Sequence, residues 1–268
     1  MLKNNKNFFI TLEGVDGCGK STQAEKISQW FEQKTGRKTI KTFEPYALRK
    51  IILSENENFS SLTDLLLFLA DRSEHVNKVI APALEQGFNV ICERYNDSTL
   101  AYQAGGHALE ISRAKNLIAA CSFPEPDIKI FLDVAPEIAF ERVKARNNKN
   151  DKFEAEGLEL IKKVSDFYRE LYKKPENINY NPCAPCEGGE GQLAVRHRVI
   201  FQQEGQLASK GVILDRREPR PSLSAKGSLL PPARAPEKIF ISCGNLNELE
   251  IFSAIKIKLE EFFNGPSS

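Results

Sequence analysis

The chain alternates between short apolar runs and longer segments in which apolar residues recur at helical spacing. The runs are rich in Ile, Val, Phe and Leu with little polar alternation, which is typical of strands covered on both faces in a parallel sheet. Five runs therefore predict five strands: Phe8–Leu12, Thr39–Phe43, Phe88–Cys92, Ile128–Val134 and Ile239–Cys243.

The segments between these runs predict helices. Residues 60–86 have the clearest boundaries, because Ser60, Ser61 and Thr63 offer N-caps and Gln86-Gly87 offers a C-terminal stop. Alternating strands and helices predict a doubly wound α/β domain. The predicted helices lie near residues 20–35, 60–86, 108–121, 136–147, 154–174 and 246–263.

Residues 183–236 differ in composition from the rest of the chain. They hold six arginines and no asparagine, whereas residues 1–182 hold eight arginines and fifteen asparagines. The segment is also rich in proline and glycine, which predicts a loosely ordered or disordered insertion, with a short hairpin over 195–201 and 211–214 left open. We therefore predict one domain from residues 1–182 and 237–264, interrupted by an insertion at 183–236.

Composition and charge narrow the choice of partners. The chain has 268 residues and a net charge of +1, so its charge balance calls for neither nucleic acid nor an anionic membrane. No apolar run approaches the roughly 20 residues of a membrane span. Six scattered cysteines indicate reduced thiols in a cytoplasmic protein. Cys183 and Cys186 have only His197 nearby as a third ligand, so a passenger insertion is favoured over a zinc site.

Residues 14–21 carry the strongest motif, G-x-x-x-x-G-K-S, between a predicted strand and a predicted helix. Its glycines let backbone N–H groups surround phosphates, and the helix N-terminus adds positive charge. The lysine of such a loop reaches the β- and γ-phosphates, and the serine hydroxyl holds Mg²⁺. The predicted ATP-binding residues are Gly14, Val15, Asp16, Gly17, Cys18, Gly19, Lys20, Ser21 and Thr22.

A phosphate loop alone leaves GTPases, ATPases and kinases open. Residues 148–151 match the guanine-reading N-K-x-D motif, but they follow a charged helix end rather than a buried strand, so we do not favour a GTPase. The same neighbourhood is rich in cations, which phosphoryl transfer needs around the migrating group. It therefore predicts a basic lid rather than an ordinary solvated helix end, with Arg142, Arg146, Lys149 and Lys152 as its cations.

Two further stretches predict a site for the phosphoryl acceptor. Phe68 and Arg72 share one helix face, and a ring beside a guanidinium suits a nucleotide, although a core ring and a surface charge would look the same. Glu93 and Arg94 end a buried strand, where open α/β sheets place their ligands. A strand-end salt bridge and polar loop is the less favoured alternative, because Ser98, Thr99, Tyr102 and Gln103 follow closely.

Several stretches together resemble the thymidylate kinases. They are "FFITLEGVDGCGKSTQ", "LLFLADRSEHV", "VICERYNDSTLAYQ", "PDIKIFLDV" and "ARNNKNDKFE", and the resemblance covers almost everything outside residues 183–236. It implies a P-loop NTPase fold of three layers, with a central parallel five-stranded sheet flanked by helices. It also implies that ATP and dTMP are converted to ADP and dTDP, for dTTP synthesis, by a homodimer.

The resemblance implies roles for individual residues at the phosphate end of the acceptor. Arg72 and Arg94 hold the acceptor phosphate, and Asp16 orients the acceptor sugar and phosphate. Ser21 and Glu93 lie at Mg²⁺. The catalytic residues that it implies are Asp16, Lys20, Arg94, Arg146 and Lys152.

It also implies roles at the base and sugar. Phe68 stacks on thymine, while Thr99 and Gln103 contact the base edge. Tyr102 lies near the sugar and disfavours a ribose 2′-OH. With Ser98, the implied dTMP-binding residues are Asp16, Phe68, Arg72, Arg94, Ser98, Thr99, Tyr102 and Gln103.

The sequence departs from the family pattern at several positions. Phe43 replaces the arginine of T-R-E-P, and Arg49 is a candidate substitute that no spacing rule singles out. Glu93 replaces an aspartate, and Lys152 replaces an arginine. Gly17 stands where one style of the family has a catalytic arginine, which indicates the bacterial, lid-dependent style. Two alternatives stay open: a related nucleotide or nucleoside kinase with another acceptor, and a non-catalytic nucleotide-binding switch.

Overall fold

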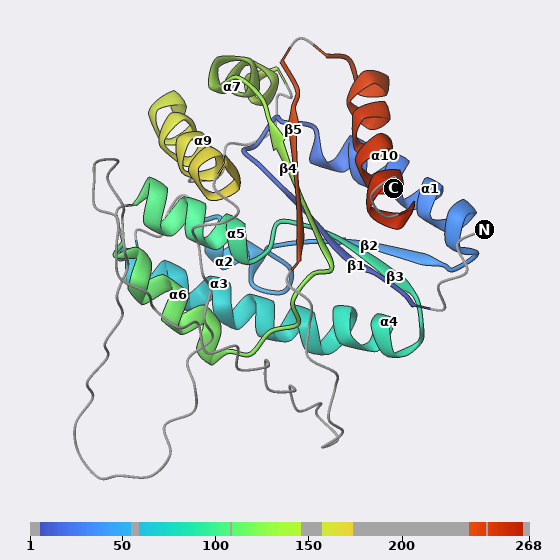
Figure 1. Ribbon diagram of the computed structural model, residues 1–268. Coiled ribbons are helices and arrows are strands. Elements are labelled where there is room, and N and C mark those ends of the chain that lie inside the picture. The colour runs from blue at the N-terminus through green and yellow to red at the C-terminus, as the bar shows by residue number, and fades with distance from the viewer. Residues whose placement is uncertain are drawn as a thin grey trace, which may run out of the picture. The chain divides into compact units, whose positions relative to one another are not determined.

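The computed structural model describes residues 6–54, 59–107, 109–145, 157–173, 236–244 and 246–264. Five strands form one parallel sheet in the order β2-β3-β1-β4-β5. Figure 1 shows β1 in the middle of the sheet. The predicted central five-stranded parallel sheet is therefore confirmed. The strands are β1 (Phe9–Glu13), β2 (Thr39–Phe43), β3 (Asn89–Glu93), β4 (Ile128–Asp133) and β5 (Glu237–Ser242).

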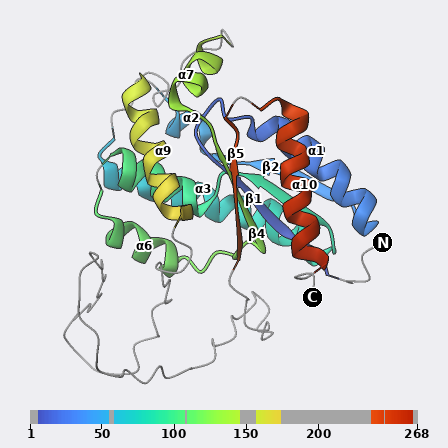
Figure 2. The ribbon, with the colours of Figure 1, turned by 45° about the horizontal axis from the view of Figure 1, so that its top comes forward.

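Helices cover both faces of the sheet, as expected for three layers. In Figures 1 and 2, α1 and α10 lie together on one side, and α3, α4 and α9 lie on the other. The helices are α1 (Lys20–Thr35), α2 (Arg49–Ile52), α3 (Ser61–His75), α4 (Ala81–Glu85), α5 (Asn96–Thr99), α6 (Ile111–Ala120), α7 (Pro136–Lys144), α9 (Gly157–Lys173) and α10 (Glu248–Asn264). Two π-helical segments, η1 (Val76–Ile80) and η2 (Leu100–Gly106), continue α3 into α4 and extend α5.

The core explains why the strands read as uninterrupted apolar runs. All five residues of β1 are buried, because helices cover the strand on both sides. On β4, the Phe131 ring stacks on Tyr168 of α9 with ring centroids 5.0 Å apart. Burying a large apolar side chain contributes about 1.5–3 kcal/mol, so these layers hold the strand ends in place. The carboxyl end of β1 is thus a rigid base for the loop that follows it.

Most predicted helices are confirmed with shorter ends, and two helices were not predicted. The helix predicted over residues 60–86 begins, as α3, at the predicted cap, where the Thr63 N–H donates to Ser60 Oγ at 3.3 Å. Residues 49–52 and 96–106 are helical although neither was predicted to be. The second begins with polar residues that are buried: Asp97 pairs with Lys129 at 3.0 Å and accepts from the Tyr172 hydroxyl at 2.8 Å. Such tertiary contacts override weak local propensity.

The predicted insertion, apart from its last residue, lies outside the described residues, and so do Cys183, Cys186 and residues 146–156. The predicted division into a domain and an insertion therefore stays a prediction. Within the described ranges, no helix combines the length and the apolar character of a membrane span.

Candidate active site

The phosphate loop connects the buried end of β1 to the first turn of α1. Gly14 and Gly17 have φ values of 139° and 83°, in the region that favours glycine. A Cβ on Gly17 would lie 2.3 Å from the Ala139 carbonyl oxygen, because α7 packs directly against the loop. Arg142 of α7 donates to the Gly17 carbonyl at 3.4 Å. The loop therefore needs glycine for close packing as well as for its backbone conformation.

Lys20 begins α1 and is buried inside this loop. Its ammonium group donates to the carbonyl oxygens of Gly14 at 3.0 Å and of Val15 at 2.9 Å. Nearby, the Ser21 hydroxyl donates to Glu93 Oε2 at 2.7 Å, so the two predicted Mg²⁺ residues lie together. A hydroxyl and a carboxylate oxygen are hard donors, which suits Mg²⁺.

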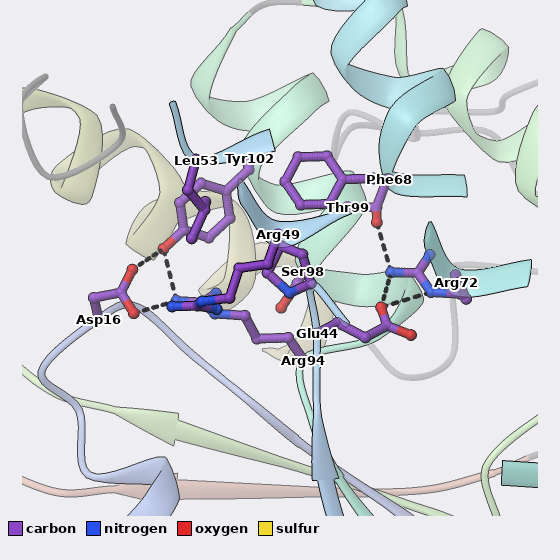
Figure 3. Close-up of a pocket in the computed structure, with 11 residues that line it drawn as sticks. Asp16, Glu44, Arg49, Leu53, Phe68, Arg72, Arg94, Ser98, Thr99 and Tyr102 are labelled. Carbon is purple, nitrogen blue, oxygen red and sulfur yellow. Dashed lines mark hydrogen bonds and ion pairs between the residues drawn. The ribbon is translucent and has the colours of Figure 1, made fainter. Parts of the chain in front are cut away.

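Asp16, Arg94 and Tyr102 form a triangle of hydrogen bonds at one end of a pocket (Figure 3). Arg94 Nη2 donates to Asp16 Oδ1 at 2.6 Å and to the Tyr102 hydroxyl oxygen at 3.2 Å. The Tyr102 hydroxyl donates to Asp16 Oδ2 at 3.2 Å. Burial alone would raise the pKa of Asp16, but the charges of Arg94 and Lys20 hold it well below its usual range. Asp16 is therefore a carboxylate at neutral pH.

The backbone of Arg94 is also unusual. Its φ is 69°, in the left-handed region that is uncommon for residues other than glycine. The Arg94 N–H donates to the Leu12 carbonyl at 2.9 Å, which ties this conformation to the strand that leads into the phosphate loop. Strained backbone of this kind clusters at functional sites.

Arg72 and Glu44 form a buried ion pair at the other end of the pocket (Figure 3). Arg72 is 1% exposed and donates from Nε and Nη2 to Glu44 Oε2 at 2.8 and 2.6 Å. It also donates to Thr99 Oγ1 at 2.9 Å and to Asn96 Oδ1 at 3.0 Å. Burial alone would lower the pKa of Arg72, but Glu44 raises it above its usual value. These contacts engage four of the five guanidinium N–H groups.

The pocket brings together seven of the eight residues predicted to bind dTMP. The space between the lining residues, open solvent included, is about 550 Å³. The residues that line it are Asp16, Glu44, Pro45, Arg49, Leu53, Phe68, Arg72, Arg94, Ser98, Thr99 and Tyr102. Gln103, the remaining residue predicted to bind dTMP, does not line the pocket. It is fully buried, and its amide nitrogen and oxygen have no hydrogen-bond partner among the described residues.

A buried carboxyl group lies beneath this pocket. The hydroxyls of Ser98 and Tyr168 donate to Glu13 Oε2 at 2.5 and 3.1 Å. Burial and the neighbouring Asp97 carboxylate raise the pKa of Glu13 to about 7. Ser98 is therefore bound to the interior as well as lining the pocket, a link that the sequence did not reveal.

Four residues that line the pocket were not among the predicted site residues: Glu44, Pro45, Arg49 and Leu53. Glu44 and Pro45 directly follow Phe43 in the altered T-R-E-P stretch, and that match is the signal for them. Arg49 was named as a substitute cation, and the pocket includes it. Leu53 carried no signal. The predicted lid cations Arg146, Lys149 and Lys152 lie outside the described residues.

Comparison with known proteins gives one consistent result. A family model described as thymidylate kinase matches residues 12–185. The thymidylate kinase of Prochlorococcus marinus (strain AS9601) is 41% identical over 182 residues, covering 63% of this chain and 85% of the relative. The thymidylate kinase of Synechococcus sp. (strain JA-2-3B'a(2-13)) is 36% identical over 211 residues, covering 76% of this chain and 98% of the relative. The crystal structure of the Ehrlichia chaffeensis thymidylate kinase matches with a TM-score of 0.51 and 29% identity, covering 63% of this chain and 88% of that one.

Proposed function

The chain belongs to the thymidylate kinase family, and we propose how its residues transfer the γ-phosphoryl group of ATP to dTMP. The comparisons identify an ATP-dependent dTMP kinase and do not favour another acceptor or a switch without catalysis. The assignment of individual residues is our proposal, and it rests on the geometry of the pocket.

One observation carries the proposal: the phosphate loop and the acceptor pocket meet at a single ion pair. Asp16 belongs to the loop and Arg94 to the pocket, and their side chains are 2.6 Å apart. A donor phosphate in the loop and an acceptor phosphate beside Arg94 would thus be neighbours. Bringing two reactants together in this way removes much of the entropic barrier to transfer.

The loop holds the donor. Backbone N–H groups and the α1 N-terminus surround the ATP phosphates, and Lys20 moves its ammonium from the loop carbonyls to the β- and γ-phosphates. Ser21 and Glu93 would hold Mg²⁺, which neutralises charge on the phosphate oxygens when bound. Their 2.7 Å contact supports this pairing, and Glu93 is long enough to reach Ser21 although the family has aspartate there.

The acceptor lies with its phosphate at the Arg94 end and its base at the Phe68 end. This orientation revises one expectation, namely that Arg72 holds the phosphate. Arg72 lies at the opposite end of the pocket from Asp16 in Figure 3, and Glu44 already neutralises its charge. We propose that its remaining N–H donates to a base carbonyl instead.

The other acceptor contacts follow from this orientation. Phe68 lines the pocket and offers a ring for stacking against thymine. Thr99 would read the base edge. Gln103, whose amide has no partner among the described residues, would join it after its buried side chain moves into the pocket. Tyr102 lies beside Asp16, where the sugar would pass.

In the reaction, an oxygen of the dTMP phosphate attacks the γ-phosphorus while the bond to the β-bridging oxygen breaks, and ADP leaves. Arg94 and Lys20 orient the two phosphates, and Asp16 fixes the direction of the Arg94 guanidinium. Cations around the migrating group lower the barrier. We propose Arg146 and Lys152 for this role, together with Arg142, which already contacts the loop.

Three further expectations remain proposals: a homodimer, a cytoplasmic location, and a passenger insertion at 183–236. Light scattering of the full chain and of a version without the insertion tests the first and the last.

A coupled assay tests the function directly. ATP is supplied with dTMP, dUMP, dCMP, dAMP or dGMP, and ADP release is followed. The proposal requires dTMP to be the fastest acceptor. Faster turnover of another monophosphate, or nucleotide binding without ADP release, would refute it.

A further inference from the structure

The charges that line the acceptor pocket do not balance. Three arginines and two acids line it. Arg72 pairs with Glu44 at 2.6 Å, and Arg94 pairs with Asp16 at 2.6 Å. The Arg49 side chain has neither a hydrogen bond nor an ion pair to any residue that the structure describes; only its backbone carbonyl accepts, from the Leu53 N–H at 3.0 Å. Its guanidinium is therefore the excess positive charge of this lining.

Arg49 is nevertheless held in place by an aromatic ring. Its guanidinium carbon lies 5.6 Å from the centroid of the Phe43 ring, within the range of a cation–π contact. Phe43 ends β2 and is 51% exposed, so its ring is available to a neighbouring side chain rather than buried in the core. Figure 3 shows the Arg49 side chain reaching across the pocket toward the end where Arg94 and Asp16 lie.

The backbone beneath Arg49 is anchored independently. Asp71 of α3 accepts hydrogen bonds from the N–H of Tyr46 at 2.6 Å and of Leu48 at 2.7 Å. This fixes the connection between β2 and α2, where Arg49 is the first helical residue. With the backbone fixed by Asp71 and the guanidinium by Phe43, Arg49 is pre-organised, which lowers the entropic cost of binding an anion.

We infer that Phe43 is a positioning residue, whose ring holds Arg49 over the acceptor pocket so that Arg49 supplies the unneutralised positive charge for the acceptor's phosphate monoester. The inference rests on the proposed acceptor site. It assigns a use to the phenylalanine that replaces a phosphate-contacting arginine in the family motif. The charge comes from α2, and the ring at the end of β2 orients it.

The test compares the binding of dTMP with that of thymidine, which has the same base and sugar but no phosphate. The variants are Arg49→Gln, Phe43→Leu, Phe43→Tyr and the double variant, with Lys50→Gln as control. Lys50 is the next residue of α2, is exposed and does not line the pocket. Lys50→Gln therefore removes one positive charge, as Arg49→Gln does, but leaves the proposed contact with the acceptor phosphate intact.

We expect Arg49→Gln to weaken dTMP binding about tenfold or more and to leave thymidine binding unchanged, since a direct charged contact is lost. Phe43→Leu should weaken dTMP binding about two- to fivefold, as expected for an exposed cation–π contact. Phe43→Tyr keeps a ring and should match the wild type, and so should Lys50→Gln. The double variant should equal Arg49→Gln alone, because Phe43 acts through Arg49.

Additive effects of Phe43→Leu and Arg49→Gln, or equal losses for dTMP and thymidine, would overturn the inference. The wild-type assay separates this failure from that of the proposed function. A wild type that phosphorylates dTMP, with an Arg49→Gln variant that binds dTMP normally, refutes only the role of Arg49 and Phe43. A wild type that does not phosphorylate dTMP refutes the proposed function itself.

Discussion

The buried pair of Glu44 and Arg72 makes a quantitative prediction about stability. The two side chains are 3% and 1% exposed, and Arg72 donates twice to one carboxylate oxygen. Removing one partner of such a pair leaves an uncompensated buried charge and costs about 3–5 kcal/mol. Glu44→Gln should therefore destabilise the fold by this amount, because a neutral amide no longer offsets the buried charge of Arg72.

Arg72→Met should cost less, about 2–3 kcal/mol by the same reasoning, because Glu44 keeps a partner. That partner is His75, whose Nδ1 lies 3.1 Å from Glu44 Oε1. The double variant Glu44→Gln/Arg72→Met leaves no unpaired ion, so it should lose only about 1–3 kcal/mol. The expected coupling energy is therefore about 2 kcal/mol or more.

Urea unfolding of the four proteins measures this cycle, with unchanged m-values as the check that each variant unfolds in the same way. The pair Glu74 and Lys78 is a matched control, since its side chains are 49% and 61% exposed and 2.5 Å apart. Its coupling should stay below about 0.5 kcal/mol. Losses at Glu44 and Arg72 that simply add within about 0.5 kcal/mol would refute the reasoning.

Three other predictions concern the site. Gly17→Ala should reduce ATP binding at least tenfold in a titration, because the methyl group would collide with α7; affinity equal to the wild type would show that the loop has room. Burial raises the pKa of Glu13 to about 7, so the folded chain still binds a proton that the unfolded chain releases near pH 4.5. The free energy of unfolding should therefore fall by about 3 kcal/mol as the pH rises from about 4.5 to about 7. Glu13→Gln should flatten this dependence in urea unfolding at pH 5 and 8, and parallel profiles would contradict it. Arg146→Ala and Lys152→Ala should lower kcat more than they raise KM for dTMP, and unchanged kcat in both would remove these residues from the mechanism.

The sheet could be predicted because its signal is local. Each strand buried on both faces is a continuous apolar run, and each predicted run overlaps a strand to within two residues at its ends. The helix over residues 96–106 had no such signal. Its polar residues are buried through partners far away in the chain, such as Lys129 and Tyr172, and no local pattern shows those partners.

The phosphate loop was predictable for the same reason, since all its chemistry lies within eight consecutive residues. The contacts within the pocket were less predictable. Nothing in "LLFLADRSEHV" indicates that Arg72 is neutralised by Glu44, which lies 28 residues away. The Arg72 guanidinium, which looks available for a phosphate in the sequence, is therefore engaged in the fold. The guanidinium of Arg49, which no motif singled out, has no ion pair with any described residue.

The central claim is that the loop and the pocket hold donor and acceptor against one another at Asp16 and Arg94. The most direct test incubates the full chain with ATP labelled at the γ-phosphorus and separates the products by chromatography. The account predicts label in dTDP when dTMP is present, and loss of that label when Arg94 is replaced by alanine. Label that appears only in inorganic phosphate, with or without dTMP, would contradict it.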